Sequence, residues 1–256
     1  MSTTFPSERT AVVTGAGGER GMGRHVARAL AAEGWSLALF DVQPGVVDFA
    51  AELAAETGAK TLGAVVDITD KAAVDAAFAE VDAALPPVLA EVNLAGIPSP
   101  ASFFEITGEL FDEVMAVNAK GTLLMMQAAG ERMIAHGLGG RIVNTSSVTA
   151  LDGGGTFSKA GYAAAKAAVQ GLTRGGAREL GPHGITCNVL LPGPFDTDIM
   201  GGTLSDERKD GMSARVPVGR VGAPHEIGAI VSFLVSEHAG YVNGASISID
   251  GGLHMH

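Results

Sequence analysis

The order of strand-like and helix-like segments predicts an α/β fold, with a parallel sheet covered by helices. Three observations lead to this prediction. Short apolar runs rich in β-branched residues alternate with longer amphipathic runs, glycines or prolines mark many of the changes between them, and acidic side chains follow the second and third apolar runs. At 256 residues, the chain suits one large domain of this class or two small ones.

The N-terminal part of the chain has the pattern of a dinucleotide-binding unit. Residues 10–14 (TAVVT) predict a strand, 15–23 (GAGGERGMG) a glycine-rich loop, 24–34 a helix ended by glycine, and 36–40 a second strand. Asp41 follows that strand, where a carboxylate would accept hydrogen bonds from the adenosine ribose. Because Asp41 would also repel a 2′-phosphate, it predicts NAD over NADP. A tight glycine turn without a ligand is the alternative interpretation.

The alternation continues to the end of the chain. The other predicted strands are 62–66, 88–94, 141–145, 185–191 and 245–250. The other predicted helices are 47–57, 71–85, 109–136 with a break near 118–121, 162–180 and 224–236. Three glycines inside the helix at 162–180 are costly there, which predicts close packing against another backbone. Residues 195–215 are mixed in character and are interpreted as a lid over a pocket.

The stretch from 141 to 166 (RIVNTSSVTALDGGGTFSKAGYAAAK) combines a strand, a polar segment and the start of a helix. Ser146 and Ser147 follow the strand, at the end where parallel α/β sheets bind ligands. Tyr162 and Lys166 are four residues apart, so their side chains project from one face of the helix. The sequence therefore predicts that these four side chains share one site.

These residue types suit proton transfer to or from a carbonyl oxygen. The Lys166 ammonium is expected to lower the pKa of the Tyr162 phenol from about 10. A general acid or base works best with a pKa near the operating pH. A serine hydroxyl would hydrogen-bond the oxygen of an alcohol or ketone while a cofactor transfers hydride. The alternative is an ordinary tyrosine–lysine pair on a helix surface.

Polar residues elsewhere extend the candidate site. Asp67 would hydrogen-bond an adenine, or else cap the following helix. Asn93 begins a turn that ends at Gly96 and supports the same group. Asn118 lies among apolar neighbours, where an amide is costly unless hydrogen-bonded. We interpret Asn118 either as an amide that satisfies backbone groups or as one that holds a water beside Lys166.

Composition argues against several functional classes. The formal net charge of −11 argues against nucleic acid and anionic membranes as partners. The first residues lack the pattern of a secretory signal, and no apolar run is long enough for a membrane span, so a soluble cytoplasmic protein is expected. The single cysteine, Cys187, is interpreted as a buried apolar residue. His254 and His256 form a tail interpreted as solvated or as an interface, with metal binding as the alternative, and no metal site is predicted.

Taken in order, the motifs closely resemble the short-chain dehydrogenase/reductase family. The resemblance is based on TGxxxxxGMG, Asp41, NLAG, the VN of VMAVNAKG, the SS pair, YAAAK, PGPFDT and the closing PVGRVGAPHEIGAIVSFLVS and ISIDGG. The resemblance covers residues 10–252. The family includes β-ketoacyl carrier-protein reductases and many alcohol and sugar dehydrogenases. The resemblance implies a single Rossmann domain over 1–256, with a doubly wound, seven-stranded parallel sheet flanked by helices and the lid at about 195–215.

The resemblance also implies a role for each motif position. Tyr162 would be the acid/base, Lys166 would lower its pKa and bind the nicotinamide ribose, and Ser147 would polarise the substrate oxygen. Asn118 would hold a water in the proton relay. The expected cofactor-binding residues are Gly15, Gly21, Met22, Gly23, Asp41, Asp67, Ile68, Asn93, Ala95, Gly96, Tyr162, Lys166, Pro192, Gly193, Phe195 and Thr197. Because family members are commonly tetramers, a homotetramer is expected.

Two departures from the family pattern concern the site. Five residues separate Gly15 from Gly21, more than is usual, so the loop amides that contact phosphate are left open. The segment between Ser147 and Tyr162 is also longer than usual. Its excess falls in 152–159, which is expected to form part of the substrate rim.

The sequence therefore predicts an NAD-dependent oxidoreductase that interconverts a secondary alcohol and a ketone of small size. Two other functions are left open. An NADPH-dependent, carrier-linked 3-oxoacyl reductase would need basic residues at the pocket mouth, and Asp41 disfavours it. A non-catalytic NAD-binding scaffold would have no need of the complete catalytic set. An apolar or cyclic substrate is suggested by the apolar residues Phe103, Leu151, Phe157, Phe195, Met200 and Leu204.

Overall fold

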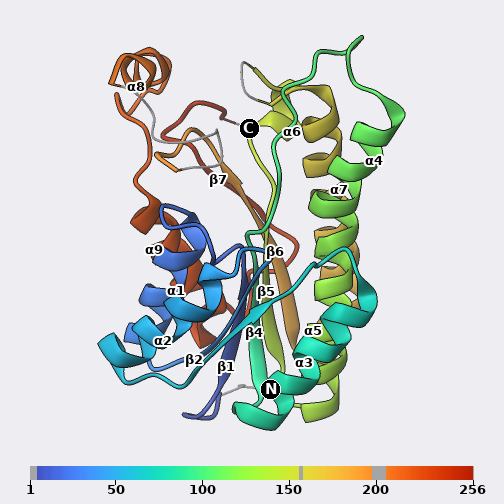
Figure 1. Ribbon diagram of the computed structural model, residues 1–256, viewed down its shortest axis with the longest axis vertical. Helices are drawn as coiled ribbons and strands as arrows, with labels where there is room; N and C mark the ends of the chain where they lie inside the picture. The colour runs from blue at the N-terminus through green and yellow to red at the C-terminus, as the bar shows by residue number, and fades with distance from the viewer. Residues whose placement is uncertain (1–4, 156–157, 198–205, 256) are drawn as a thin grey trace.

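The computed structural model describes residues 5–155, 158–197 and 206–255, apart from the side chains of residues 206 and 208. Its centre is a seven-stranded parallel sheet with the strand order β3-β2-β1-β4-β5-β6-β7 (Figure 1). The predicted α/β fold with seven parallel strands is confirmed. The strands are β1 Thr10–Thr14, β2 Ser36–Asp41, β3 Thr61–Val65, β4 Val88–Asn93, β5 Gly140–Thr145, β6 Ile185–Pro192 and β7 Ser246–Ile249.

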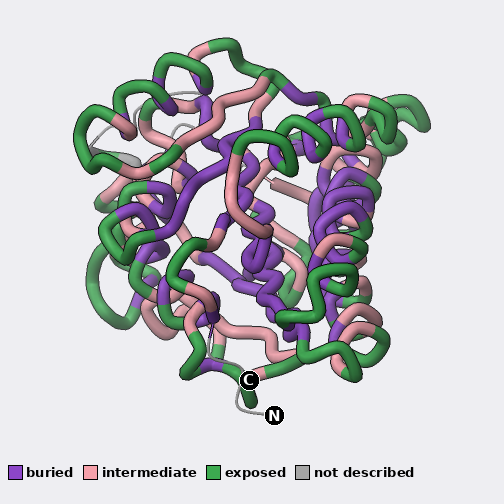
Figure 2. The backbone as a smooth tube through the Cα atoms, turned by 90° about the horizontal axis from the view of Figure 1, so that it is seen from below, coloured by how far each residue is buried: buried purple, intermediate pink, exposed green. Residues whose placement is uncertain are grey.

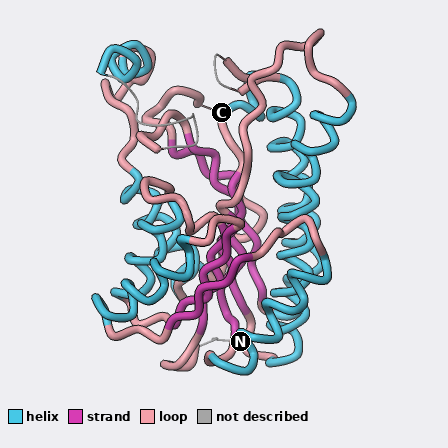
Figure 3. Tube along the Cα trace, in the orientation of Figure 1, coloured by secondary structure: helices cyan, strands magenta, loops and turns pink. Residues whose placement is uncertain are grey.

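Helices cover both faces of the sheet (Figure 3). One face is covered by α1 Met22–Ala32, α2 Gly45–Thr57 and α9 Pro224–Val235. The other is covered by α3 Lys71–Ala84, α5 Thr122–His136 and α7 Ala160–Leu180, with α4 Gly108–Met115 beside α7. The short helices α6 Thr149–Asp152 and α8 Asp206–Ser213 lie toward the end of the molecule where the C-terminus is seen (Figure 1). Figure 2 shows that the buried backbone is concentrated in the strands and the inward helix faces.

The strand order reverses at β1, which pairs with β2 on one side and β4 on the other. Open α/β sheets bind ligands at such a switch point, outside the carboxyl ends of the strands. The loops after β1 and β4 are tied together there, because Thr14 Oγ1 accepts hydrogen bonds from the amides of Leu94 and Ala95, both at 3.1 Å. A Cβ atom on Gly15 would lie 2.8 Å from Ala95 N, and its φ of 73° also favours glycine. The glycine therefore permits the close approach of the two loops.

The long predicted helix at 109–136 is broken where the sequence suggested. A π-helical turn, Ala116–Gly121, separates α4 from α5. Asn118 lies within it, and its Nδ2 donates to the carbonyl oxygens of Val114 and Ile97, both at 3.0 Å. The amide thus satisfies backbone carbonyls at the break, as one of the two interpretations proposed. π-Helical turns occur often at functional sites.

The glycines of α7 differ in their surroundings. A Cβ on Gly176 would lie 2.7 Å from Met126 Cε and 3.2 Å from Cys187 Sγ, so close packing explains this glycine, although the neighbours are side chains. Gly171 and Gly175 have nothing within 4 Å of the same position, and the packing explanation fails for them within this chain. Cys187 itself is a free, buried thiol, in agreement with its interpretation as an apolar residue.

Two features are absent from the part of the chain that the structure describes. No helix there is both long and apolar enough to cross a membrane. The same residues contain no group of three or more histidine, cysteine, aspartate or glutamate side chains that could hold a metal ion.

Candidate active site

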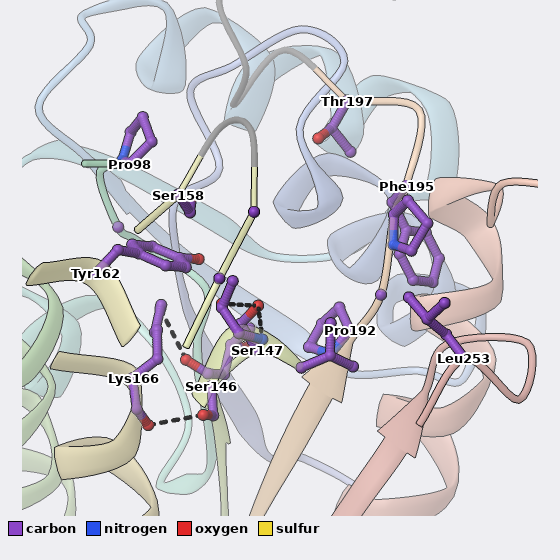
Figure 4. A pocket seen from close by; sticks show the side chains of 18 of the residues that line it. Pro98, Ser146, Ser147, Ser158, Tyr162, Lys166, Pro192, Phe195, Thr197 and Leu253 are labelled. Atoms are coloured by element: carbon purple, nitrogen blue, oxygen red, sulfur yellow. Dashed lines mark hydrogen bonds between the residues drawn. The ribbon is translucent and has the colours of Figure 1, made fainter. Parts of the chain in front are cut away.

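A cavity of about 230 Å³ lies at the carboxyl ends of β4, β5 and β6. Ser147 lies at its centre, with Tyr162 and Lys166 on one side and Pro192, Phe195 and Leu253 on the other (Figure 4). The structure therefore brings together the residues that the sequence placed in one site. The cavity is also lined by Met212 and Arg215, from the segment that the sequence predicts to be a lid.

Tyr162 and Lys166 lie in the first two turns of α7, and both are buried. The Lys166 ammonium donates to the carbonyl oxygen of Thr145 at 2.8 Å and lies 5.5 Å from the centre of the Tyr162 ring. The end of β5 thus fixes the lysine below the tyrosine ring. The alternative of an exposed surface pair is wrong.

The two serines have different roles in the structure. Ser146 is buried, and its hydroxyl donates to the carbonyl oxygen of Lys166 at 2.7 Å, which joins β5 to α7. The Ser147 hydroxyl lines the cavity, accepts a hydrogen bond from Thr149 Oγ1 at 2.6 Å and lowers the pKa of Tyr162. Of the pair, Ser147 is the serine that acts on the pKa of the tyrosine, so its role as the catalytic serine stays a prediction.

The pKa values correct one expectation. Burial raises the pKa of Tyr162 to about 12, although the hydrogen bond with Ser147 opposes this shift. Burial also lowers the pKa of Lys166 to about 8. The expected lowering of the tyrosine pKa by the lysine is therefore not found in this structure, because desolvation outweighs the attraction of an ammonium that is directed at Thr145. The phenol is neutral at pH 7 and is a proton donor.

Asn118 and Lys166 both lie against Gly96. A Cβ on this glycine would be 2.6 Å from Asn118 Oδ1 and 3.3 Å from Lys166 Nζ. The Asn118 oxygen is buried and makes no hydrogen bond with any described residue, whereas its nitrogen makes two. A buried acceptor without a partner is costly. Its position beside the ammonium suits the second interpretation of Asn118 as well, because it can accept from a water there.

The glycine-rich loop is held by Asp41. The carboxylate at the end of β2 accepts from Gly17 N at 2.8 Å and from Gln43 N at 2.9 Å. A Cβ on Gly17 would lie 2.7 Å from the Asp41 carboxylate carbon. Gly21 then caps α1, so that Met22 and Gly23 form its first turn, where anions bind favourably.

Other expected cofactor residues are placed in different ways. Asp67 is exposed and accepts from Thr69 N at 2.9 Å, whereas Asp70 caps α3, so Asp67 is not the helix cap. The Ile68 side chain packs at Gly121, where an added Cβ would lie 2.7 Å from it. Asn93 is directed away from its turn, because its Nδ2 donates to Glu91 and Asn144 inside the sheet.

Two buried hydroxyl groups complete the fit to a bound polar group. Thr197 Oγ1 and Thr145 Oγ1 make no hydrogen bond with any described residue, and both residues line the cavity. Thr197 was among the expected cofactor residues, whereas Thr145 was missed, since a threonine at a strand end is also an ordinary β-forming residue. Together with the N-terminus of α1 at Met22 and Gly23, these hydroxyls suit a nicotinamide dinucleotide.

The expected substrate pocket is only partly confirmed. Phe195 lines the cavity and is buried, but Phe103 and Leu151 are exposed, at 73% and 42%, and do not line it. Phe157, Met200 and Leu204 lie outside the described residues. Asp152 and Ser158 line the cavity, as expected for the substrate rim, and Arg215 comes from the predicted lid segment. Leu253 lines the cavity without having been singled out, because only the fold brings the C-terminal segment to this site.

Comparisons with known proteins identify the class. A family profile described as enoyl-(acyl carrier protein) reductase matches residues 15–254. The chain is 37% identical over 254 residues to (3R)-3-hydroxyacyl-CoA dehydrogenase of Mus musculus, covering 96% of each chain. It is 38% identical over 255 residues to L-rhamnose 1-dehydrogenase (NAD(P)(+)) of Azotobacter vinelandii, covering 97% of each.

A solved structure agrees with these relatives. The crystal structure of a short-chain type dehydrogenase/reductase from Mycobacterium marinum superposes with a TM-score of 0.90 at 31% identity, covering 97% of this chain and 96% of that one. The chain therefore belongs to the short-chain dehydrogenase/reductase family of oxidoreductases, which use a nicotinamide cofactor.

Proposed function

We propose that the protein is an NAD(H)-dependent oxidoreductase that interconverts a secondary alcohol and a ketone. The observation that supports it most is that Ser147 and Tyr162 line the same cavity, with Lys166 fixed below the tyrosine ring. Two hydroxyls at one cavity can bind one substrate oxygen together. A non-catalytic scaffold has no chemical need for this arrangement.

The side chains have distinct roles in this proposal. The bound cofactor supplies or accepts the hydride. In reduction, Ser147 donates a hydrogen bond to the carbonyl oxygen and Tyr162 gives that oxygen its proton. In oxidation, Tyr162 must take the proton, and its raised pKa makes this step faster at alkaline pH. Lys166, with a water held by Asn118 Oδ1, would return protons to the tyrosine from the side of Gly96.

The preference for NAD is proposed from Asp41. Its carboxylate lies at the glycine-rich loop, where a 2′-phosphate would meet a negative charge. We expect NADH to bind at least ~10-fold more tightly than NADPH, and Asp41→Ala to remove most of this difference. Titration of both nucleotides, followed by their fluorescence, measures it. Tighter binding of NADPH by the unmodified protein would contradict the proposal.

One observation favours a second candidate, a reductase for 3-oxoacyl thioesters. Arg215 is exposed and lines the cavity, so it supplies a basic residue of the kind that a phosphorylated carrier would need. The relative from Mus musculus is named for a hydroxyacyl-CoA. The two candidates are separated by comparing acetoacetyl-CoA with a free ketone. If Arg215→Ala raises KM only for the thioester, the second candidate gains support, whereas turnover of the free ketone alone favours the first.

A further inference from the structure

The C-terminal segment after β7 forms part of the cavity wall. Asp250 turns the chain sharply: its carboxylate accepts from Gly252 N at 3.0 Å and from His254 N at 2.7 Å. Gly251 and Gly252 have φ values of 64° and 85°, which favour glycine in this turn. The turn places Leu253 in the cavity lining, on the far side of Ser147 from Tyr162 (Figure 4).

A second contact fixes this wall to the opposite rim. His254 Nε2 lies 2.9 Å from Asp152 Oδ2, although the two residues are about a hundred positions apart in the chain. Asp152 ends α6 and also lines the cavity, and its Oδ1 accepts from Gly154 N at 2.8 Å. The side chains of Asp152 and His254 are 34% and 23% exposed, so the pair is partly shielded from water. We call Asp152 and His254 the rim pair.

The contact between Asp152 and His254 is expected to add little to the stability of the fold. Ion pairs that remain accessible to solvent contribute little to folding. Both rim residues belong to segments with no other evident role: Asp152 lies in the lengthened segment before Tyr162, and His254 lies in the tail whose function the sequence left open. The contact joins the segment that carries Leu253 to the opposite rim of the cavity.

We propose that Leu253 determines substrate size, and that the rim pair of Asp152 and His254 holds it in position. Leu253 limits the bulk of the group attached to the reacting carbon on the side away from Tyr162. His254 is a positioning residue, because it acts through the tail and makes no contact with the reacting atoms. The proposal depends on the oxidoreductase function above and adds the residue that selects among alcohols.

The test uses the whole enzyme, excess NAD and secondary alcohols of increasing size, from 2-butanol through cyclohexanol to 1-phenylethanol. Leu253→Ala should raise kcat/KM for the largest alcohol by about 10-fold relative to the smallest, because it removes a branched side chain from the cavity wall. His254→Ala should raise KM about fivefold for all of them with kcat unchanged, since it loosens a wall without touching the chemistry. An unchanged size preference in Leu253→Ala would overturn the proposal.

Two further variants separate positioning from general damage. His254→Gln keeps a side-chain N–H that can donate to Asp152 and should restore a low KM. His238→Ala removes an exposed histidine outside the cavity lining and should match the unmodified enzyme. If His254→Gln behaves like His254→Ala, or His238→Ala also raises KM, the positioning role is lost. Thermal unfolding of each variant checks that the fold is kept.

Binding distinguishes failure of this proposal from failure of the proposed function. Dissociation constants of the same alcohols from the enzyme–NADH complex are read from NADH fluorescence, without turnover. If alcohols bind but none is oxidised, the oxidoreductase proposal fails, while a shift of binding toward larger alcohols in Leu253→Ala still supports the size-selecting wall. If no alcohol binds to the unmodified enzyme or to Leu253→Ala, the wall proposal is overturned.

Discussion

Two buried polar clusters lie on the same side of the sheet. One lines the cavity, and the other is enclosed between strands and a helix. The cavity cluster consists of Ser147, Tyr162 and Lys166. The sheet cluster consists of Glu91, Asn93, Asn144 and Thr173, each at most 3% exposed. Both contain ionisable groups whose pKa values are shifted by burial, but only the first opens into a cavity.

The sheet cluster is a chain of hydrogen bonds between β4, β5 and α7. Asn93 Nδ2 donates to Glu91 Oε1 at 3.0 Å and to Asn144 Oδ1 at 2.9 Å, and Asn144 Nδ2 donates to Thr173 Oγ1 at 2.9 Å. The other Glu91 oxygen has no partner among the described residues. Burial raises the pKa of Glu91 to about 8, so the folded protein keeps this carboxyl neutral at pH 7.

Burial shifts pKa values in both clusters, but the consequence differs between a site that opens into a cavity and one that does not. In the cavity cluster, desolvated groups keep protons ready for a substrate that enters beside them. In the sheet cluster, no such ligand can approach, and the raised pKa of Glu91 only lowers stability above its normal titration range. Removing a cavity group should therefore damage catalysis, whereas removing a sheet group should change stability alone.

The largest effect is expected in the cavity cluster. Tyr162→Phe removes the proton donor but keeps the ring, so kcat should fall by at least ~1,000-fold. The affinity for NADH should stay within about twofold, because the phenol oxygen is directed at the substrate site. Steady-state kinetics with a nucleotide titration measure both quantities. Activity of Tyr162→Phe near that of the unmodified enzyme would mean that another group supplies the proton.

The second effect concerns the stability of the sheet cluster. Unfolding ionises Glu91 above about pH 4.5, whereas the folded carboxyl stays neutral up to about pH 8. Stability is therefore lost as pH rises through this window, by about 1.4 kcal/mol per pH unit at most. Glu91→Gln should be more stable than the unmodified protein by a few kcal/mol at pH 8, with little difference at pH 4. Denaturant unfolding at both pH values measures this.

Kinetics provide the control for Glu91→Gln. The substitution should leave kcat and KM unchanged, because the side chain lies outside the cavity. A loss of stability at pH 8 would show instead that the carboxyl makes an interaction that an amide cannot replace.

Lys166→Met is expected to have opposite effects on activity and stability. Activity should fall by about 100-fold, because the ammonium beside the proton donor is lost. Stability at pH 7 should rise, since burial lowers the pKa of this lysine to about 8 and the folded state therefore resists its charge. The gain in stability should shrink as pH rises from about 8 to 10.5, where the unfolded lysine also loses its proton. Parallel activity and unfolding assays test this, and a loss of stability at pH 7 would contradict the comparison.

The smallest effect is expected from Thr173→Val, which keeps the shape and removes one acceptor of Asn144. We expect a loss of about 1 kcal/mol in the free energy of unfolding, the usual contribution of one buried hydrogen bond. Catalysis should not change, as measured by kcat/KM. A fall in kcat/KM of tenfold or more would show that the sheet cluster is coupled to the cavity.

Short stretches of the sequence are enough to predict four features: the α/β alternation, the break near Asn118, the helix face shared by Tyr162 and Lys166, and the location of Ser147 at a strand end. Each follows from a short-range rule: β-branched runs, glycine and proline signals, or helical spacing. These features are encoded within a few residues, so they can be predicted without knowledge of the packing.

The remaining features depend on the tertiary structure, which brings distant segments of the chain into contact. It turned Asn93 into the sheet, joined His254 to Asp152, and placed Leu253 and Arg215 at the cavity. It also reversed the expected shift of the Tyr162 pKa, because spacing along a helix indicates which charge is near but not how much water is excluded. Burial is a property of the whole fold, and the pKa values that govern the chemistry depend on it.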